Sequence, residues 1–197
     1  MAYTSCITPI AASIVPNCAH PITGGFTGRA ILIPLDENPS FTVDASNPRI
    51  LTAIAPSGAN KFVAIDNQDF VDKFAGTVKA LNADGGIKRY QKTVSFSVPL
   101  RGAEKAKDIV EPLIQSGLGF AIVLEKQDRV GDGSFEVYGY LNGLKVNADG
   151  YSQDETALNG SVTLTMSCVE AWEEVVMLDT DYATTAAEFE TMLAACW

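Results

Sequence analysis

The sequence has little of the chemistry that enzymes and metal sites use. His20 is the single histidine among 197 residues, which removes most general-base and metal-ligand arrangements at once. Cys18 and His20 do not make a Cys–His dyad on their spacing alone, and no second cluster completes a zinc site with them. A phosphate loop, a Gly-x-Ser-x-Gly elbow and a dinucleotide fingerprint are also missing. We therefore expect no enzyme, no cofactor and no catalytic, cofactor-binding or metal-binding residues, although the sequence leaves open a glycosidase-like carboxylate pair.

The segment 128–133, Asp-Arg-Val-Gly-Asp-Gly, has part of the pattern of a calcium-binding loop. Such loops place oxygen ligands at alternate positions and end on a bidentate glutamate. Val130 occupies a ligand position, and Gly139 stands where the glutamate is required. We interpret the segment as a turn, because Gly131 and Gly133 can both adopt a positive φ.

Long apolar runs are absent too. No window reaches the roughly 18 apolar residues of a membrane-spanning helix, so we expect no membrane partner. No Lys or Arg precedes Arg29, and Pro9 and Pro16 interrupt the apolar part of the N-terminus, which makes a poor secretion signal. The four cysteines could pair in three ways, but without secretion we expect free, buried thiols, with Cys196 the most exposed: Cys6, Cys18, Cys168 and Cys196.

Positive charge is scarce, and after Lys145 it is absent. The net charge is −10. Beyond Lys145 the only charged residues are Asp149, Asp154, Glu155, Glu170, Glu173, Glu174, Asp179, Asp181, Glu188 and Glu190. Nucleic-acid affinity depends on Lys and Arg that displace counterions, so this composition disfavours nucleic-acid binding. The carboxylates form either a solvated face that keeps the protein in solution, or a surface that repels DNA or attracts a basic partner.

Strand signals dominate what is present. We expect the apolar run 119–126 to be buried on both faces, and 135–140 to be a half-buried strand because it alternates with a period of two. Asn142-Gly143 is typical of a type I′ hairpin turn. The polar segment 147–159 is predicted to be a loop.

Further strands are predicted in 29–35, 49–54, 61–65, 75–81, 90–100 and 160–169, with a short one within 173–178. We expect 49–54 and 61–65 to pair as a hairpin, with 36–40 a loop and 82–86 a turn. A short helical turn is expected at 66–74. In 160–169 the alternation is strict, with Val162, Leu164, Met166 and Cys168 on one face.

Two segments have helical periodicity. In 101–116 an apolar stripe of Ala103, Ala106, Ile109, Val110, Leu113 and Ile114 predicts a helix that packs over the sheet. Pro112 is expected to kink it, and Gly117 to end it. The second helix, 184–196, is expected to be capped by Thr184 or Thr185. Its apolar side is Phe189, Met192, Leu193 and Cys196, which docks on its own sheet or on a neighbouring subunit.

The fold class is therefore mainly β (α+β), an antiparallel β-sandwich or half-open barrel with a flanking helix at about 101–116 and a C-terminal helix at about 184–196. We divide the chain into an extended N-terminal arm (1–28), a β domain (29–178) and a C-terminal helical extension (179–197).

The order of these segments resembles that of bacteriophage tail-tube and tail-completion proteins over roughly residues 90–170. The motifs are Gly-Asp-Gly-Ser-Phe-Glu-Val-Tyr-Gly (131–139), Leu-Asn-Gly-Leu-Lys-Val (141–146) and Ser-Val-Thr-Leu-Thr-Met-Ser (161–167). The style also resembles virion proteins of phages that infect gut Bacteroidales. The resemblance implies subunits that join sheets edge to edge into a ring whose lumen carries DNA. Two features depart from the family: a long projecting hairpin has no counterpart unless it is 41–65, and the C-terminal helix is extra.

We expect from this resemblance a structural virion protein, made in the host bacterial cytoplasm, that forms rings of a DNA-conducting tail tube. Its expected partners are itself, other tail or connector proteins, and DNA that passes without specific binding. The two departures leave a head–tail connector ring as an alternative. A monomeric carbohydrate-binding module is the rival of another class, with Tyr138, Tyr140 and Tyr151 as its candidate exposed aromatics.

Overall fold

The computed structural model describes residues 25–57, 62–66, 74–81, 89–99, 108, 111–129, 131, 133–153 and 161–196. Its elements, in chain order, are β1 (Phe26–Pro34), η1 (Leu35–Glu37), β2 (Ser40–Val43), β3 (Ile50–Ala55), β4 (Val63–Asp66), β5 (Ala75–Leu81), β6 (Arg89–Pro99), α2 (Glu111–Gln115), β7 (Phe120–Lys126), β8 (Phe135–Tyr138), β9 (Lys145–Gln153), β10 (Ser161–Glu170), β11 (Val176–Met177) and α3 (Tyr182–Ala195). The protein is mainly β with added helices, which confirms the predicted class. The strands predicted at 29–35, 75–81, 90–100 and 160–169 appear as β1, β5, β6 and β10.

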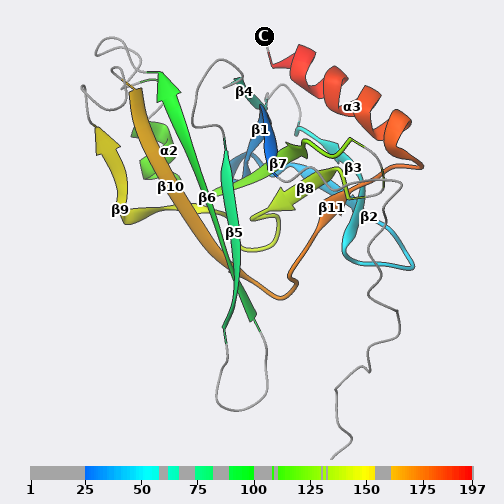
Figure 1. Ribbon diagram of the computed structural model, residues 1–197, viewed down its shortest axis with the longest axis horizontal. Helices are drawn as coiled ribbons and strands as arrows, with labels where there is room; N and C mark the ends of the chain where they lie inside the picture. Colours follow the sequence, from blue (N-terminus) through cyan, green and yellow to red (C-terminus); the bar gives the residue numbers. More distant parts are fainter. Residues whose placement is uncertain are drawn as a thin grey trace, which may run out of the picture.

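Two sheets pack face to face (Figure 1). The seven-stranded sheet has the order β2-β3-β11-β8-β7-β1-β4, and the four-stranded sheet has the order β5-β6-β10-β9. Neighbouring strands are antiparallel except for the short parallel pair β3 and β11. The arrangement confirms a β-sandwich-like fold.

Apolar side chains from both sheets fill the space between them. Leu32 and Ile122 of the larger sheet meet Phe96, Leu164 and Met166 of the smaller one, and each of the five is at most 2 % exposed. The face of β10 predicted from strict alternation is buried as expected. Sheet-to-sheet packing of this kind is what a period of two in the sequence encodes.

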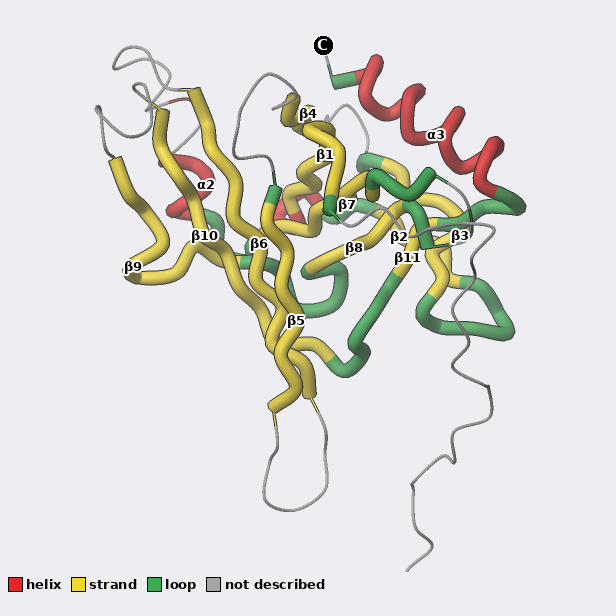
Figure 2. The backbone as a smooth tube through the Cα atoms, in the orientation of Figure 1, coloured by secondary structure: helices red, strands yellow, loops and turns green. Residues whose placement is uncertain are grey.

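Helix α3 covers the opposite face of the larger sheet and makes a third layer (Figure 2). Phe189 and Met192 pack with Ile31, Val123 and Phe135, and the ring centroids of Phe135 and Phe189 are 5.0 Å apart. Of the two docking modes left open by the sequence, the helix therefore uses the one on its own sheet.

The cap of α3 differs from the prediction of Thr184 or Thr185. Asp181 is the N-cap residue, and its carboxylate accepts a hydrogen bond of 2.8 Å from the backbone N–H of Thr184. Thr185 instead lies buried, where its hydroxyl donates to the carbonyl of Asp181. An aspartate at this position also interacts favourably with the helix dipole.

The prediction of a half-buried strand at 135–140 is wrong. All four residues of β8 are buried, because the larger sheet has the smaller sheet on one face and α3 on the other. The same sandwiching confirms the two-sided burial predicted for β7, in which Phe120–Glu125 are all buried. Alternating residues in a strand do not reveal whether the more polar face is also buried by another layer.

The hairpin predicted at Asn142-Gly143 is also wrong. A type I′ turn needs a positive φ at both central residues, and of the two only Gly143 has one (φ 68°). The turn carries the chain from one sheet to the other, since β8 pairs with β7 whereas β9 pairs with β10. A Cβ atom on Gly143 would collide with the backbone carbonyl of Leu118, which is why glycine is required here.

The early strands pair differently from the prediction as well. The predicted hairpin between 49–54 and 61–65 is absent, because β3 pairs with β2 and β4 pairs with β1. The loop predicted at 36–40 contains η1 and the first residue of β2. Two four-residue edge strands are too short for their alternation to fix a partner.

The loop predicted at 147–159 is wrong in its first part, because residues 147–153 belong to edge strand β9, while 154–160 lie outside the described residues. The helix predicted at 101–116 is confirmed at 111–115, with Pro112 in the first turn, where its missing N–H breaks no bond, and residues 101–107, 109 and 110 lie outside the described residues. Leu113 is buried as predicted, whereas Ile114 is 49 % exposed. Of the helical turn predicted at 66–74, Asp66 ends β4 and 67–73 lie outside the described residues.

None of the helices within the described ranges has both the length and the apolar character that crossing a membrane requires.

Removing the Phe189 ring tests whether α3 is an integral layer. We expect Phe189→Ala to lower the free energy of unfolding by about 3–5 kcal/mol, because the ring is fully buried and would leave a cavity. Chemical denaturation followed by circular dichroism measures the change. Thr191→Ala, on the exposed side of the same helix, is the control and should change stability by less than about 0.5 kcal/mol. Equal effects would contradict the three-layer packing.

Candidate functional site

The residues with catalytic or metal-binding potential do not assemble into a reaction centre in the described part of the chain. Cys6, Cys18 and His20 lie outside it. Cys168 is a buried free thiol, and Cys196 is half-buried rather than exposed. Burial, followed by the nearby Glu170 carboxylate, raises the pKa of the Cys168 thiol to about 12, so it is protonated and unreactive at neutral pH. Within the same residues no group of three His, Cys, Asp or Glu side chains is placed to hold a metal ion.

The loop from Asp128 to Ser134 is organised as a turn. The Ser134 hydroxyl donates to the carbonyl oxygens of Asp128 and Gly131, at 3.0 Å and 2.9 Å. Gly131 has a φ of 123° with open space around it. Backbone carbonyls in this loop therefore accept from a hydroxyl of the chain itself, as expected for a structural turn between β7 and β8.

The tyrosines considered for carbohydrate binding do not form an exposed aromatic face. Tyr138 is only 2 % exposed, and burial raises the pKa of its hydroxyl well above the ordinary value of 10.0. Tyr140 is half-buried, with its ring edge-on to Phe41 at 5.4 Å. The side chain of Tyr151 lies outside the described residues.

Within the described part of the chain, one ion pair has both of its partners buried in the sandwich interior. The Lys92 ammonium of β6 lies 2.9 Å from Oε2 of Glu170 at the end of β10, and the two side chains are 0 % and 1 % exposed. Oε1 of Glu170 accepts a hydrogen bond from the backbone N–H of Leu141. The Tyr138 ring faces the ammonium at 5.3 Å, and the Val137 carbonyl lies 3.4 Å from it.

This pair joins the smaller sheet to the turn after β8. Desolvating two charges is costly, so a buried pair of this kind is better suited to fixing one arrangement than to adding stability. Lys92 and Glu170 each occupy an inward position of an otherwise apolar strand face, which fixes the register of β6 against β10 at this end. A structural role therefore accounts for this cluster without a bound substrate.

Breaking the pair on one side is the direct test. We expect Lys92→Met to destabilise the protein by about 3–5 kcal/mol, because the Glu170 carboxylate stays buried without its partner. Adding Glu170→Gln should recover most of the loss, since the neutral amide still accepts from the Leu141 N–H. Urea denaturation of the single and double variants measures both. A double variant no more stable than Lys92→Met alone would contradict this account of the pair.

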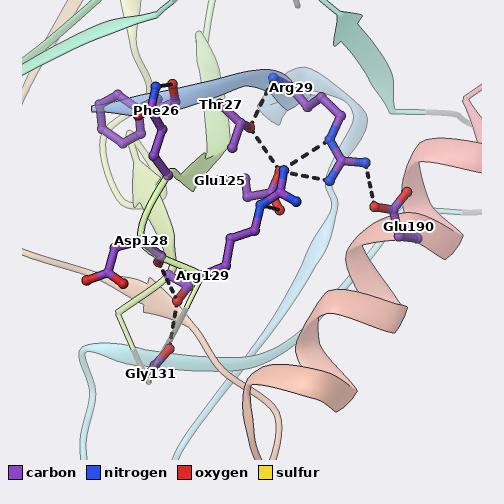
Figure 3. A network of polar contacts seen from close by, with 10 residues as sticks. Phe26, Thr27, Arg29, Glu125, Asp128, Arg129, Gly131 and Glu190 are labelled. Carbon is purple, nitrogen blue, oxygen red and sulfur yellow. Dashed lines mark hydrogen bonds and ion pairs between the residues drawn. The ribbon is translucent and has the colours of Figure 1, made fainter. Parts of the chain in front are cut away.

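A second network holds α3 against strands β1 and β7 of the larger sheet (Figure 3). Oε2 of the buried Glu125 accepts from the Thr27 hydroxyl at 2.9 Å and from the Arg29 guanidinium at 2.8 Å. The other side of Arg29 pairs with Glu190 of α3, and Arg129 reaches Oε1 of Glu125 at 3.4 Å. The charges of this network are mutually paired, so it serves to connect β1, β7 and α3.

A third polar group lies at the same end of β7, around the next residue, Lys126. The Lys126 ammonium is 2.8 Å from Glu174 and 3.3 Å from Glu136. Desolvation lowers the pKa of Lys126, but the two carboxylates outweigh it and the net direction is upward. The lysine is therefore charged at neutral pH and is engaged within its own chain.

The end of the β5–β6 hairpin extends past the packed part of the protein. We call this end, residues 77–81 and 89–91, the arm. Figure 2 shows these strand ends projecting beyond the other strands. At Gly76 strand β5 lies close to the larger sheet: a Cβ atom there would lie 2.8 Å from both Phe26 and Tyr138. Beyond it no residue of β5 is buried.

The arm has two different faces. Val78, Ala80 and Tyr90 share the face that continues the sandwich interior, yet Val78 is 36 % exposed and Tyr90 is half-buried. Lys79 and Arg89 share the opposite face. Both are exposed, and neither forms an ion pair with any residue in the described ranges.

The outer face of the smaller sheet carries hydroxyl side chains. Ser95 lies 2.9 Å from Thr165, and Ser97 lies 3.4 Å from Thr163, each pair between the hydroxyl oxygens of β6 and β10. These hydroxyls bond across the strands, and the positive charges on this sheet face lie toward its arm and its β9 edge.

Comparison of the chain with protein-family models, with curated proteins and with solved structures finds no match.

Sequence reasoning missed both the buried ion pair and the arm. The signal for the pair was present: Lys92 and Glu170 fall on the inward parity of β6 and β10, in line with Val94 and Cys168. The signal for the arm was weaker, since 75–81 looks like any short strand. The exposure of the arm depends on where the larger sheet ends, and this is set by how the two sheets pack and not by the residues of the arm.

Proposed function

We propose that this chain is a structural virion protein of a bacteriophage tail, which assembles with itself into rings that form or extend a DNA-conducting tube. The observation that carries the proposal is β5, a seven-residue strand at the edge of the smaller sheet in which no residue is buried. Its pairing with β6 runs from Ala75 to Leu81 without a bulge. A long, regular, open edge of this kind is a template for another strand unless a partner covers it.

Other edges support the same reading. Within the described residues, β2 and β4 end the larger sheet and β9 ends the smaller one opposite β5. Val43 of β2 and Val63 of β4 are 37 % and 45 % exposed, which is high for valine in a strand. In a closed ring each subunit covers the edge of the next, so head-to-tail pairing satisfies all of them.

The charge balance supports a passage for DNA rather than a binding site. The chain carries a net charge of −10, and four of the eight cations in the described residues are already paired internally: Arg29, Lys92, Lys126 and Arg129. A lumen lined by such a protein repels phosphates, so DNA slides without specific contacts. Other tail or connector proteins would complete the particle.

Two alternatives are less well supported. A connector ring at the head–tail junction would use similar edges, but the projecting ends of β5 and β6 favour the tail tube, since the family resemblance implies a long projecting hairpin, considered above at 41–65. A carbohydrate-binding module needs exposed stacking aromatics, and Tyr138 is buried while Tyr140 packs on Phe41. The proposed role is structural and not enzymatic.

We expect the purified protein to form rings or tubes as its concentration rises, measured by multi-angle light scattering with negative-stain imaging. Val78→Asp should raise the concentration for half-assembly by at least about tenfold, because it places a charge on the open arm. Ile114→Asp, at an exposed apolar residue on helix α2 rather than on an edge strand, is the matched control and should leave assembly unchanged. A monomer of 21.0 kDa at every concentration would contradict self-assembly.

A further inference from the structure

We infer that Lys92 and Glu170 condense after folding into an intramolecular amide, an isopeptide bond that joins β6 to β10 through their side chains. The reacting groups are the amine of Lys92 and the carboxyl group of Glu170, whose Nζ and Oε2 atoms are 2.9 Å apart. The product is a covalent cross-link in the sandwich interior. The inference goes beyond the proposed function and does not depend on it, because the bond forms within one chain.

Burial of the pair favours this reaction. The Lys92 and Glu170 side chains are 0 % and 1 % exposed, so both charges are shielded from solvent. Two opposite charges in an apolar interior retain a large desolvation cost even when they are paired. An amide is neutral, so condensation removes both charges at once. The same shielding protects the amide from hydrolysis after it has formed.

The fold holds the two groups in contact. Lys92 lies directly opposite Cys168 in the register of β6 and β10, which is one inward position away from Glu170. Groups that are fixed in a reactive arrangement behave as though their concentration were on the order of 10⁵–10⁸ M. This proximity offsets the unfavourable condensation of an amine with a carboxylate that are free in water.

The contacts around the pair suit an attack on the carboxyl carbon. Oε1 of Glu170 accepts a hydrogen bond of 3.1 Å from the backbone N–H of Leu141, a donor that stabilises the negative charge developing on this oxygen. The Val137 carbonyl, 3.4 Å from Nζ, and the Tyr138 ring hold the nitrogen beside the carboxyl group. Oε2 receives no hydrogen bond of ordinary geometry from the described residues, although Nζ is close to it. Oε2 is therefore the oxygen that can leave.

The reaction balances without a co-reactant. The ammonium first transfers one proton to Oε2, which gives an amine and a carboxylic acid. The nitrogen lone pair attacks the carboxyl carbon, and the electron pair of the C=O double bond moves onto Oε1. A second nitrogen proton then moves to the Oε2 hydroxyl, the bond from carbon to Oε2 breaks, and the electron pair on Oε1 restores the carbonyl. The products are one amide and one water.

We expect the bond to form slowly. Lys92 pairs with no second carboxylate in the part of the chain that the structure describes, so a further acid that would relay the protons is missing from its ion pairs. Freshly prepared protein therefore carries the ion pair, and the urea comparison of the Lys92 variants above refers to this state. Incubated protein carries the amide.

Intact-mass spectrometry of fresh and incubated protein tests the inference. We expect the denatured chain to lose one water, about 18 Da, in a fraction that increases with incubation time. Trypsin should then fail to cleave after Lys92, because the lysine is acylated. It should release a branched peptide that joins residues 90–101 to residues 146–197, since no Lys or Arg follows Lys145. Fragmentation of this peptide locates the link at Lys92 and Glu170.

Two variants remove the reacting amine. Lys92→Met should keep its full mass throughout the incubation, and so should Lys92→Met with Glu170→Gln, in which no charge is left buried. Lys126→Met is the matched control, because Lys126 lies 2.8 Å from Glu174 but the two side chains are 29 % and 51 % exposed. It should lose one water as the wild type does.

Two results would overturn the inference. Wild-type protein that keeps its full mass after prolonged incubation would show that the ion pair is the final state. A loss of one water that persists in both Lys92 variants would place the dehydration elsewhere, for example in a succinimide at Asp132-Gly133. Neither result bears on assembly, so the light-scattering experiment tests the proposed function separately.

Discussion

The fold depends on one constraint: the larger sheet is covered on both faces. The smaller sheet buries one face of β1 and β7, and α3 buries the other, so neither strand can carry an unpaired polar side chain in its interior. Ala30–Ile33 and Ala121–Leu124 satisfy this with continuous apolar runs. Glu125, where β7 leaves the interior, is the first charge and is held by Thr27, Arg29 and Arg129.

The polar networks follow from this layering. Arg29 and Glu190 join the larger sheet to α3, and Lys92 with Glu170 closes the sandwich beside the arm. Lys126 joins β7 to the segment before β11 within the larger sheet. Buried charges are retained when each has a partner, and they fix register more than they stabilise. The Lys92–Glu170 pair marks the end of the sandwich interior, and the arm begins there. Because the β5–β6 hairpin is longer than the sandwich, the apolar face of the arm is exposed.

The sequence predicted the elements better than their partners. Strict alternation in β10 and the apolar run of β7 identified strands and their buried faces, since burial of one or both faces leaves a direct trace in the residues. Pairing left no such trace in the four-residue strands β2 and β4. Asn142-Gly143 has the composition of a hairpin, but the approach of Leu118 to Gly143 demands a glycine for another reason. The arm escaped prediction because its exposure is set by the end of a different sheet.

Assembly through the arm is the central functional claim, and amide hydrogen exchange of assembled and dilute protein tests it most directly. The account predicts that exchange within residues 75–81 slows markedly on assembly, because the edge of β5 and its apolar face become covered. The strand β7 should be protected in both states, since its partners lie within one chain. Exchange in 75–81 that is equally fast in the assembled and the dilute protein would contradict the account.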